Sequence, residues 1–260
     1  MDLGLKDKVI LVSGGASGIG KGIVKALTYE GAIPCILDRN KEETDSCVSE
    51  IRAEGKNVFS IIADLTDVKA CENAIAELSK QTKGIYGLVN NAGINDGVSL
   101  ENGSDEEFLL SLERNAGHYY TLAHMTLPFL KESKGKIINI VSKTFTTGQG
   151  GTSGYAAANG VRAAITENWA IELSKYEITV NAIVVSECWT PQYKSWINQN
   201  PDPQRELERI NSKIPLNNRM TTVEEIADMA TFLLSDKSSV CSGQLVYVDG
   251  GYVHLDRAQT

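Results

Sequence analysis

A glycine-rich turn near the start of the chain could hold a phosphate group. Directly after an apolar run at Val9–Ser13, glycines stand at positions 14, 18 and 20, and a helical pattern follows from Lys21. Glycine lets the backbone bend sharply and approach a pyrophosphate, whose charge then faces the amide groups at the start of the helix. The turn supplies five expected cofactor contacts, Gly14, Ser17, Gly18, Ile19 and Gly20.

An acidic residue strengthens this interpretation. Asp38 ends the second apolar run, 18 residues after Gly20, where a carboxylate can accept hydrogen bonds from the ribose hydroxyls of an adenosine group. The same carboxylate would repel a ribose 2′-phosphate, although the adjacent Arg39 could offset part of that repulsion. The pattern therefore favours NAD, with NADP as the alternative, and a simple turn residue is the other interpretation of Asp38.

The elements that must position these residues alternate along the chain. Strands are expected at Val9–Ser13, Ile33–Asp38, Val58–Ala63, Gly87–Asn90, Lys136–Val141, Thr179–Val184 and Gln244–Val248. Helical stretches between them include Lys21–Glu30, Glu42–Glu54, Val68–Lys80 and Glu106–Lys131. This order predicts an α/β fold, a Rossmann-type doubly wound parallel sheet with helices on both faces, in a single domain over residues 1–260.

The segment 189–218 follows the sixth expected strand and is rich in Pro, Asn and Gln. Ligands of an open parallel sheet bind beyond the carboxyl ends of its strands, so a long excursion there can cover the site. We interpret this segment as an insertion that forms a substrate lid.

Composition excludes several classes of function. A net charge of −8 argues against nucleic-acid and anionic-membrane partners, which need clustered Lys and Arg. The chain has neither an apolar signal region nor a stretch of roughly 18 apolar residues, so a cytoplasmic location is expected. Its five cysteines fit reduced thiols, and its three histidines form no metal-ligand pattern, so no metal is expected.

The chain resembles the short-chain dehydrogenase/reductase family over essentially its whole length. The matching residues are the glycine-rich turn, Asp64, Asn90-Asn91-Ala92-Gly93, Asn115, Ser142 and Tyr155. The resemblance implies that Ser142 polarises the substrate oxygen, Tyr155 exchanges the proton and Asn115 holds a proton-relay water. It also implies nucleotide contacts by Asp64, Leu65, Asn91, Ala92, Gly93 and Thr190, the last at the nicotinamide carboxamide. Hydride transfer between NAD(P) and a carbonyl is the implied reaction.

One catalytic position departs from the family. The family has a lysine four residues after the tyrosine, on the same helix face, and here that residue is Asn159. Such a lysine sets a cation beside the phenolate and binds the nicotinamide ribose, whereas asparagine keeps a hydrogen bond but brings no charge. Losing the charge leaves roughly 3 to 4 kcal/mol uncompensated, so we expect weakened hydride chemistry. Lys143 is the only nearby cation that the sequence offers, and it should point away from Ser142 if the strand continues through both.

Other departures fall around the same pocket, at Val141, Ala116-Gly117 and Val185-Ser186. Their concentration favours a pocket remodelled by divergence or by engineering, and natural variation within a large family is the alternative. Cys188 is expected near the pocket mouth as an inert thiol, since no histidine is placed to activate it.

Four local strings, at residues 93–97, 111–115, 147–150 and 249–257, resemble bacterial sugar dehydrogenases of the L-fucose dehydrogenase type. This resemblance implies an aldose such as L-fucose, oxidised at C1. A sugar site must satisfy many hydroxyls, and polar candidates with one stacking face are Asn95, Lys143, Gln149, Glu187, Trp189 and His254. Because polar loops are common at sheet ends, each of them could instead be structural.

Two other functions stay open. The protein could bind nucleotide without turnover, or it could perform non-redox chemistry around Tyr155, Lys143 or Cys188. The family resemblance also implies a homotetramer, built on the small and apolar faces of the helix from about Glu106 and of the helix over 155–173.

Overall fold

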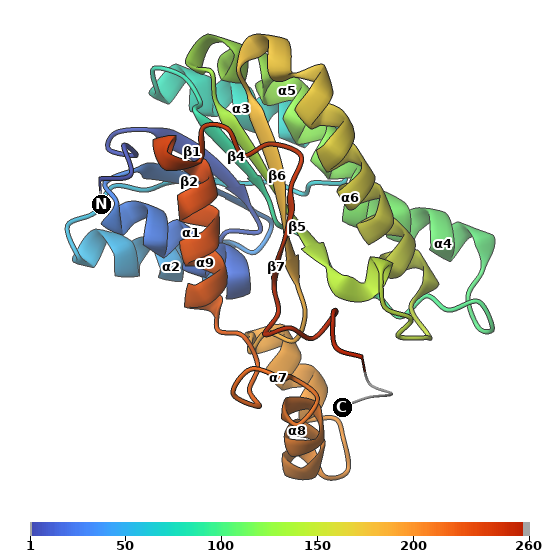
Figure 1. Ribbon diagram of the computed structural model, residues 1–260. Coiled ribbons are helices and arrows are strands. Elements are labelled where there is room, and N and C mark those ends of the chain that lie inside the picture. Colours follow the sequence, from blue (N-terminus) through green and yellow to red (C-terminus); the bar gives the residue numbers. More distant parts are fainter. Residues whose placement is uncertain (1, 257–260) are drawn as a thin grey trace.

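A seven-stranded parallel sheet lies at the centre of the computed structural model, which describes residues 2–256 (Figure 1). The strands run in the order β3-β2-β1-β4-β5-β6-β7. Their bounds are β1 (Val9–Ser13), β2 (Ile33–Asp38), β3 (Phe59–Ile62), β4 (Gly87–Asn90), β5 (Lys136–Ser142), β6 (Thr179–Val185) and β7 (Leu245–Val248). The order reverses between β1 and β4, the switch point at which ligands of such sheets bind. Arg257, which ends the fourth sugar-dehydrogenase-like string, lies outside the described residues.

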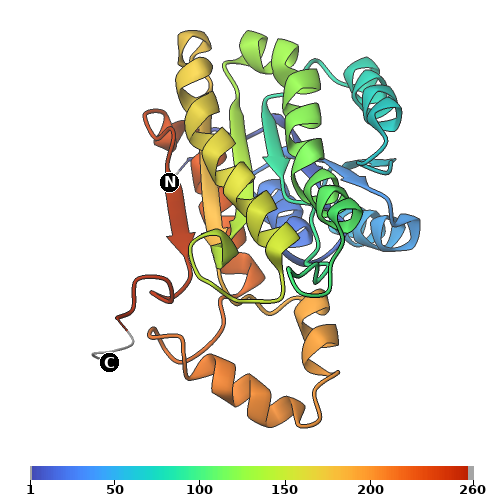
Figure 2. The same ribbon diagram turned by 90° about the vertical axis from the view of Figure 1, so that its right-hand side faces the viewer.

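Helices cover both faces of this sheet (Figures 1 and 2). One face is covered by α1 (Gly18–Tyr29), α2 (Lys41–Ala53) and α9 (Val223–Leu234), and the other by α3 (Val68–Gln81), α5 (His118–Ser133) and α6 (Ser153–Glu172). Alternation along β1 explains the two layers, because Ile10 and Val12 join the first core while Val9 and Leu11 join the second. The predicted α/β fold, with its doubly wound parallel sheet, is confirmed.

Most helices begin at a side-chain cap, and α1 is an exception. Asn40 accepts from the Glu43 amide at the start of α2, and Asp67 accepts from the Ala70 amide at the start of α3. Ser17, at the cap position of α1, makes no such bond, and the first turn of α1 carries no acidic residue. The amides at the start of α1 therefore remain available to an external anion.

The helix expected over Glu106–Lys131 is wrong as one continuous element. It is divided into α4 (Asp105–Leu112), a π-helical turn η1 (Glu113–Gly117) and α5. Apolar periodicity alone does not reveal a widened turn, since its flanks keep the helical pattern. Asn115 lies in the middle of this turn.

Two short helices, α7 (Pro191–Ile197) and α8 (Pro203–Asn211), project beyond the carboxyl ends of the strands (Figures 1 and 2). They fill the segment interpreted as a lid. A small apolar cluster of Ile197, Ile210, Ile214 and Met220 holds them together, separate from the main cores. Three single-turn helices lie between these elements, namely η2 (Lys143–Phe145), η3 (Ser174–Tyr176) and η4 (Asp236–Ser238).

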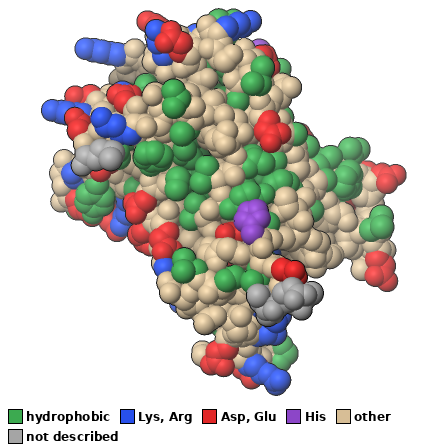
Figure 3. Space-filling model, in the orientation of Figure 1, with side chains coloured by type: hydrophobic (Ala, Val, Ile, Leu, Met, Phe, Trp, Pro, Cys, Tyr) green, Lys and Arg blue, Asp and Glu red, His purple; other side chains and the backbone are tan. Residues whose placement is uncertain are grey.

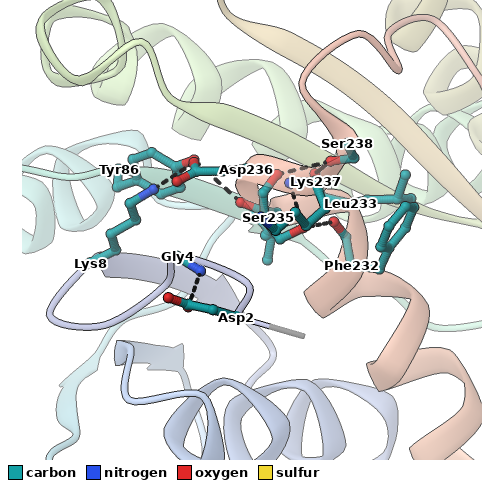
Figure 4. Close-up of polar contacts among 11 residues, drawn as sticks. Asp2, Gly4, Lys8, Tyr86, Phe232, Leu233, Ser235, Asp236, Lys237 and Ser238 are labelled. Carbon is teal, nitrogen blue, oxygen red and sulfur yellow. Dashed lines mark hydrogen bonds and ion pairs between the residues drawn. The ribbon is translucent and has the colours of Figure 1, made fainter.

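A polar cluster fastens the opposite end of the sheet (Figure 4). The Lys8 ammonium, before β1, lies 2.8 Å from an Asp236 carboxylate oxygen and 3.8 Å from the centre of the Tyr86 ring. The Tyr86 hydroxyl donates to the same carboxylate oxygen, at 3.2 Å. These contacts tie the starts of β1 and β4 to the turn η4 that follows α9, far from the carboxyl ends of the strands. Among the described residues, no helix is long and apolar enough to cross a membrane.

Candidate active site

A cavity of about 710 Å³ opens at the carboxyl ends of the strands. Loops after β1 to β6 and the start of α7 form its walls. The following predicted nucleotide contacts line it: Gly14, Ser17, Gly18, Ile19, Asp38, Asp64, Leu65, Asn91, Ala92, Gly93 and Thr190. Ser142 and Tyr155 line the same cavity. The structure thus brings the two expected halves of the site together.

The glycine-rich turn has a conformation that larger residues would not tolerate. Gly14 and Gly18 have φ values of +63° and +52°, in the left-handed region. Gly20, which was also expected to contact the nucleotide, does not line the cavity, and a Cβ atom there would collide with the carbonyl oxygen of Gly14. Together with the uncapped start of α1, this close-packed turn fits the pyrophosphate of a dinucleotide.

The loop after β4 holds this turn in place. The Asn91 side chain donates to the carbonyl oxygens of Ser13 and Gly14, at 3.0 and 3.1 Å. In return, the Ser13 hydroxyl accepts from the amides of Asn91 and Ala92. The predicted contacts from the first and fourth strands therefore form one hydrogen-bonded unit.

Two carboxylates face the adenosine end of the cavity. Asp38 accepts from the amides of Ala16 and Asn40, at 3.2 and 3.0 Å, which fixes its side chain at the end of β2. Asp64 accepts from the amide and the hydroxyl of Thr66, and these bonds lower the pKa of Asp64. A ribose with free hydroxyls suits these carboxylates, while an added phosphate would meet their negative charge, part of which Arg39 in the same wall offsets.

Ser142 and Tyr155 reach the cavity from β5 and from the first turn of α6. Asn159 is fully buried and joins these two elements. Its side-chain oxygen accepts from the Ser142 amide at 2.7 Å, and its side-chain nitrogen donates to the Tyr155 carbonyl at 2.8 Å. Asn159 therefore holds the backbones of both residues in place and supplies no charge.

Asn115 is also buried behind the cavity wall. Its side-chain oxygen accepts from the Ile94 amide at 2.8 Å, and its side-chain nitrogen donates to the Ser111 carbonyl at 3.0 Å. Its main-chain carbonyl accepts from Arg162 Nε at 2.6 Å. The widened turn η1 thus directs one backbone carbonyl toward a cation.

Sequence reasoning missed several residues of the cavity wall, among them Arg162 and His118. Arg162 could have been found, since Tyr155, Asn159, Arg162 and Thr166 share one face of α6 at spacings of four, three and four. His118 gave no such signal because it follows the unexpected turn η1. Burial, with a smaller contribution from the Arg162 charge, lowers the pKa of His118 to about 3, so this imidazole is neutral at pH 7.

The six residues predicted to bind substrate are not among the described residues that line the cavity. Lys143 and Glu187 lie beside it, in an ion pair of 2.9 Å, and Tyr193 of α7 donates to Glu187 at 2.8 Å. The other four predicted residues have separate surroundings. Asn95 accepts from Thr152, Gln149 is exposed, Trp189 is 6.4 Å from the Tyr193 ring, and His254 packs on Tyr247.

The expected geometry of Lys143 is different from the observed one. β5 ends at Ser142, and Lys143 begins the turn η2 instead of continuing the strand. Its ammonium is buried against Glu187 and lies 4.6 Å from the centre of the Tyr252 ring. With its charge already paired, Lys143 is poorly placed to serve as the cation of the reacting pair.

Cys188 lines the cavity as a buried thiol. Burial raises its pKa to about 12, and the carboxylates of Glu224 and Glu225 add to the shift. Because the thiolate is the nucleophilic form, this cysteine is inert at neutral pH. The structure agrees with the expected inert thiol.

Comparison with known proteins identifies the family of this chain. Residues 14–253 match the family described as Enoyl-(Acyl carrier protein) reductase, which spans nearly the whole fold. The chain belongs to the short-chain dehydrogenase/reductase family. It is therefore an oxidoreductase of that family, whose members use a nicotinamide nucleotide.

Relatives of different activity are similar to this family member at the same level. A 3-oxoacyl-[acyl-carrier-protein] reductase of Thermotoga maritima is 32% identical, over 96% of this chain and 99% of its own. An L-fucose dehydrogenase of Bos taurus is also 32% identical, over 94% of this chain and 88% of its own. Because the chain is equally identical to a reductase and to a sugar dehydrogenase, sequence identity does not decide its substrate. The residues of the site have to decide it.

Solved structures agree on the fold. The Cj0485 dehydrogenase is 43% identical, with a TM-score of 0.94, over 99% of this chain and 98% of its own. A variant actinorhodin polyketide ketoreductase, solved with NADPH, is 26% identical, with a TM-score of 0.91, over 96% of this chain and 98% of its own.

Proposed function

We propose that this protein is an NAD-dependent dehydrogenase that oxidises C1 of an aldose such as L-fucose. The observation that carries the proposal is the shared cavity, with the nucleotide turn and Asp38 at one end and Ser142 with Tyr155 at the other. Similarity to L-fucose dehydrogenases supports the sugar, and the ionic and aromatic groups beside the cavity offer partners for hydroxyls.

When bound, NAD supplies the hydride acceptor for the hydrogen that leaves C1. Gly14, Gly18 and the start of α1 would hold its pyrophosphate, and Asp38 its adenosine ribose. Ser142 donates a hydrogen bond to the substrate oxygen, and Tyr155 accepts the hydroxyl proton on its phenolic oxygen. The sugar thus loses a hydride and a proton, and the product is the lactone.

The direct test is NADH formation by the purified protein with a panel of aldoses. L-fucose or a close analogue should give the highest kcat/KM, with NAD preferred over NADP, and Y155F should lose activity by about a hundredfold or more. Tight NAD binding without oxidation of any aldose would instead support the alternative of a nucleotide-binding protein without turnover. Activity that persists without nucleotide would support non-redox chemistry.

We also propose a cytoplasmic homotetramer. The free state of all five cysteines agrees with a reducing compartment. Apolar side chains gather across the middle of one molecular face, over the region of β7, α9 and α6 (Figure 3), and exposed ones of α6 and α9 include Val161, Ile171 and Phe232. Such a surface suits contact between copies of the chain, and sedimentation analysis of the purified protein tests the assembly.

A further inference from the structure

Arg162 is a buried cation for which the described residues provide no carboxylate within ion-pair distance. Its guanidinium donates only to neutral oxygens. The acceptors are the carbonyls of Asn115, Ile140 and Ala92 and the side chains of Asn159 and Asn115. Burying an unpaired charge is unfavourable for folding, even when carbonyl dipoles surround it. The buried charge of Arg162 is therefore not explained by a gain in folding stability.

The guanidinium lies next to the residue that would exchange the proton. Its central carbon is 5.8 Å from the centre of the Tyr155 ring, and both side chains line the cavity. A Cβ atom on Gly93 would collide with Arg162 Nη2, so the absence of a side chain there gives the guanidinium its place. The positive charge therefore reaches the cavity wall between the nucleotide loop and the tyrosine.

We propose that Arg162 supplies the positive charge that stabilises the deprotonated form of Tyr155, as a positioning residue two helical turns further along α6. This inference rests on the proposed function, in which the substrate hydroxyl gives its proton to the phenolic oxygen of Tyr155. A cation beside a phenolate favours the charged form, which is the form that accepts the proton.

Asn159 fits this role as a spacer. Its side-chain oxygen accepts from Arg162 Nη1 at 3.2 Å while it accepts from the Ser142 amide. A lysine at 159 would bring a second buried cation against the first, and the two like charges would repel each other. An uncharged asparagine at 159 therefore allows the arginine to lie here. Because Arg162 supplies the positive charge in this proposal, the weakened hydride chemistry expected from Asn159 is no longer expected.

Three titratable groups face the guanidinium. His118 and Tyr119 come from α5, where the Tyr119 ring centre lies 4.4 Å from the guanidinium carbon, and Tyr155 comes from α6. His118 is neutral at pH 7 and adds no second positive charge. Of the other cations near the cavity, Lys143 is paired with Glu187, while Arg39 and Arg114 line the cavity wall.

The test separates charge from hydrogen bonding. R162Q keeps hydrogen-bond donors without the charge, R162K keeps the charge, and R52Q, on the distant helix α2, is the control. We expect R162Q to lose at least tenfold in kcat/KM near neutral pH and to recover as the pH rises, whereas R162K should keep most of the activity. NAD affinity, measured by calorimetry, should change less than about threefold in all three.

A second measurement needs neither substrate nor nucleotide. The ultraviolet tyrosinate absorbance that the wild type shows and Y155F lacks should appear at higher pH in R162Q than in the wild type or R162K. An unchanged onset in folded R162Q would overturn the proposal. If no aldose is oxidised, the proposed function fails, while this titration still decides the role of Arg162.

Moving the charge gives a further check. The double variant N159K/R162M returns a cation to the position four residues after Tyr155 and should recover activity that R162M alone loses. N159K alone should lower the rate, because it adds a second cation. A several-fold increase in the rate of N159K would contradict the proposal, since it would mean that the wild-type site lacks a cation.

Discussion

Asp38 is the residue on which the proposed nucleotide preference depends. It faces the cavity with its carboxylate fixed by two backbone amides, and its nearest cationic neighbour in sequence, Arg39, is exposed. A ribose 2′-phosphate near this carboxylate would meet a like charge that cannot rotate away.

Replacing Asp38 with Ser should therefore change the cofactor preference. Removing the carboxylate relieves the repulsion and leaves Arg39 available to the phosphate, so the ratio of kcat/KM for NADP to that for NAD should rise about tenfold or more. Steady-state kinetics with both nucleotides measures it. E42Q, which removes an exposed charge of α2 outside the cavity wall, serves as the control and should leave the ratio unchanged.

At this scale the sequence predicted the residues that belong to motifs and missed those that depend on side-chain direction. Ser142, Tyr155 and Asp38 are tied to strand ends or to a fixed spacing, so their place at the cavity could be predicted. Arg162 belongs to no motif, and only its helical spacing from Tyr155 and Asn159 in α6 indicates that it points inward. The six substrate residues stand on loops, whose side chains a sequence pattern does not orient.

Among the elements, the glycine-rich turn has the strictest geometry. Gly20→Ala should abolish tight NAD binding, because the new Cβ would collide with the Gly14 carbonyl and force the turn away from the start of α1. Calorimetric titration with NAD measures the loss, which we expect to exceed tenfold in Kd. Gly160→Ala is the matched control, since nothing described lies within 4 Å of its added Cβ. Similar losses in both variants would contradict this interpretation.

A buried ion pair connects the turn after β5 with the loop that leads from β6 to the lid. Glu187→Gln should leave the Lys143 ammonium without its partner, at a cost of about 3 kcal/mol in the free energy of unfolding. Denaturant unfolding measures this change. The double variant K143M/E187Q removes both charges and should regain most of the loss. An E187Q protein as stable as the wild type would show that the pair contributes little.

Element boundaries explain where the predicted fold was inexact. Strand ends shifted by only one residue or so, because β-branched runs define them directly, as at β5, which runs through Ser142. The π-helical turn η1 and the lid helices α7 and α8 were not predicted. Their formation depends on packing against α6 and on a small apolar cluster, neither of which local periodicity shows.

For the whole molecule, one buried histidine links stability to pH. The pKa of His118 is about 3 in the folded protein and near 6.5 in an unfolded chain. Between these two pH values the unfolded state binds one more proton than the folded state. The contribution of neutral His118 to the free energy of unfolding is therefore complete above about pH 6.5 and is lost as the pH falls toward 3.

His118→Gln should flatten this dependence. In the wild type the free energy of unfolding should fall with a slope of up to about 1.4 kcal/mol per pH unit from this residue, and the variant should lack that part. Urea unfolding at several pH values between about 6 and 4.5 measures the slopes. His124→Gln replaces an exposed histidine and should keep the wild-type slope. Equal slopes for both variants would exclude His118 as the source.

The π-helical turn Glu113–Gly117 also affects how relatives of this protein should be compared. A π-helical turn holds about one residue more than an α-helical turn, so deleting one residue here would turn the segment into regular α-helix. The Asn115 carbonyl would then accept from a backbone amide one turn further along the helix, and its contact with Arg162 would be lost. The contact between Asn115 and Arg162 therefore depends on the length of this segment. A one-residue gap at this place in an alignment separates chains that can build the contact from chains that cannot.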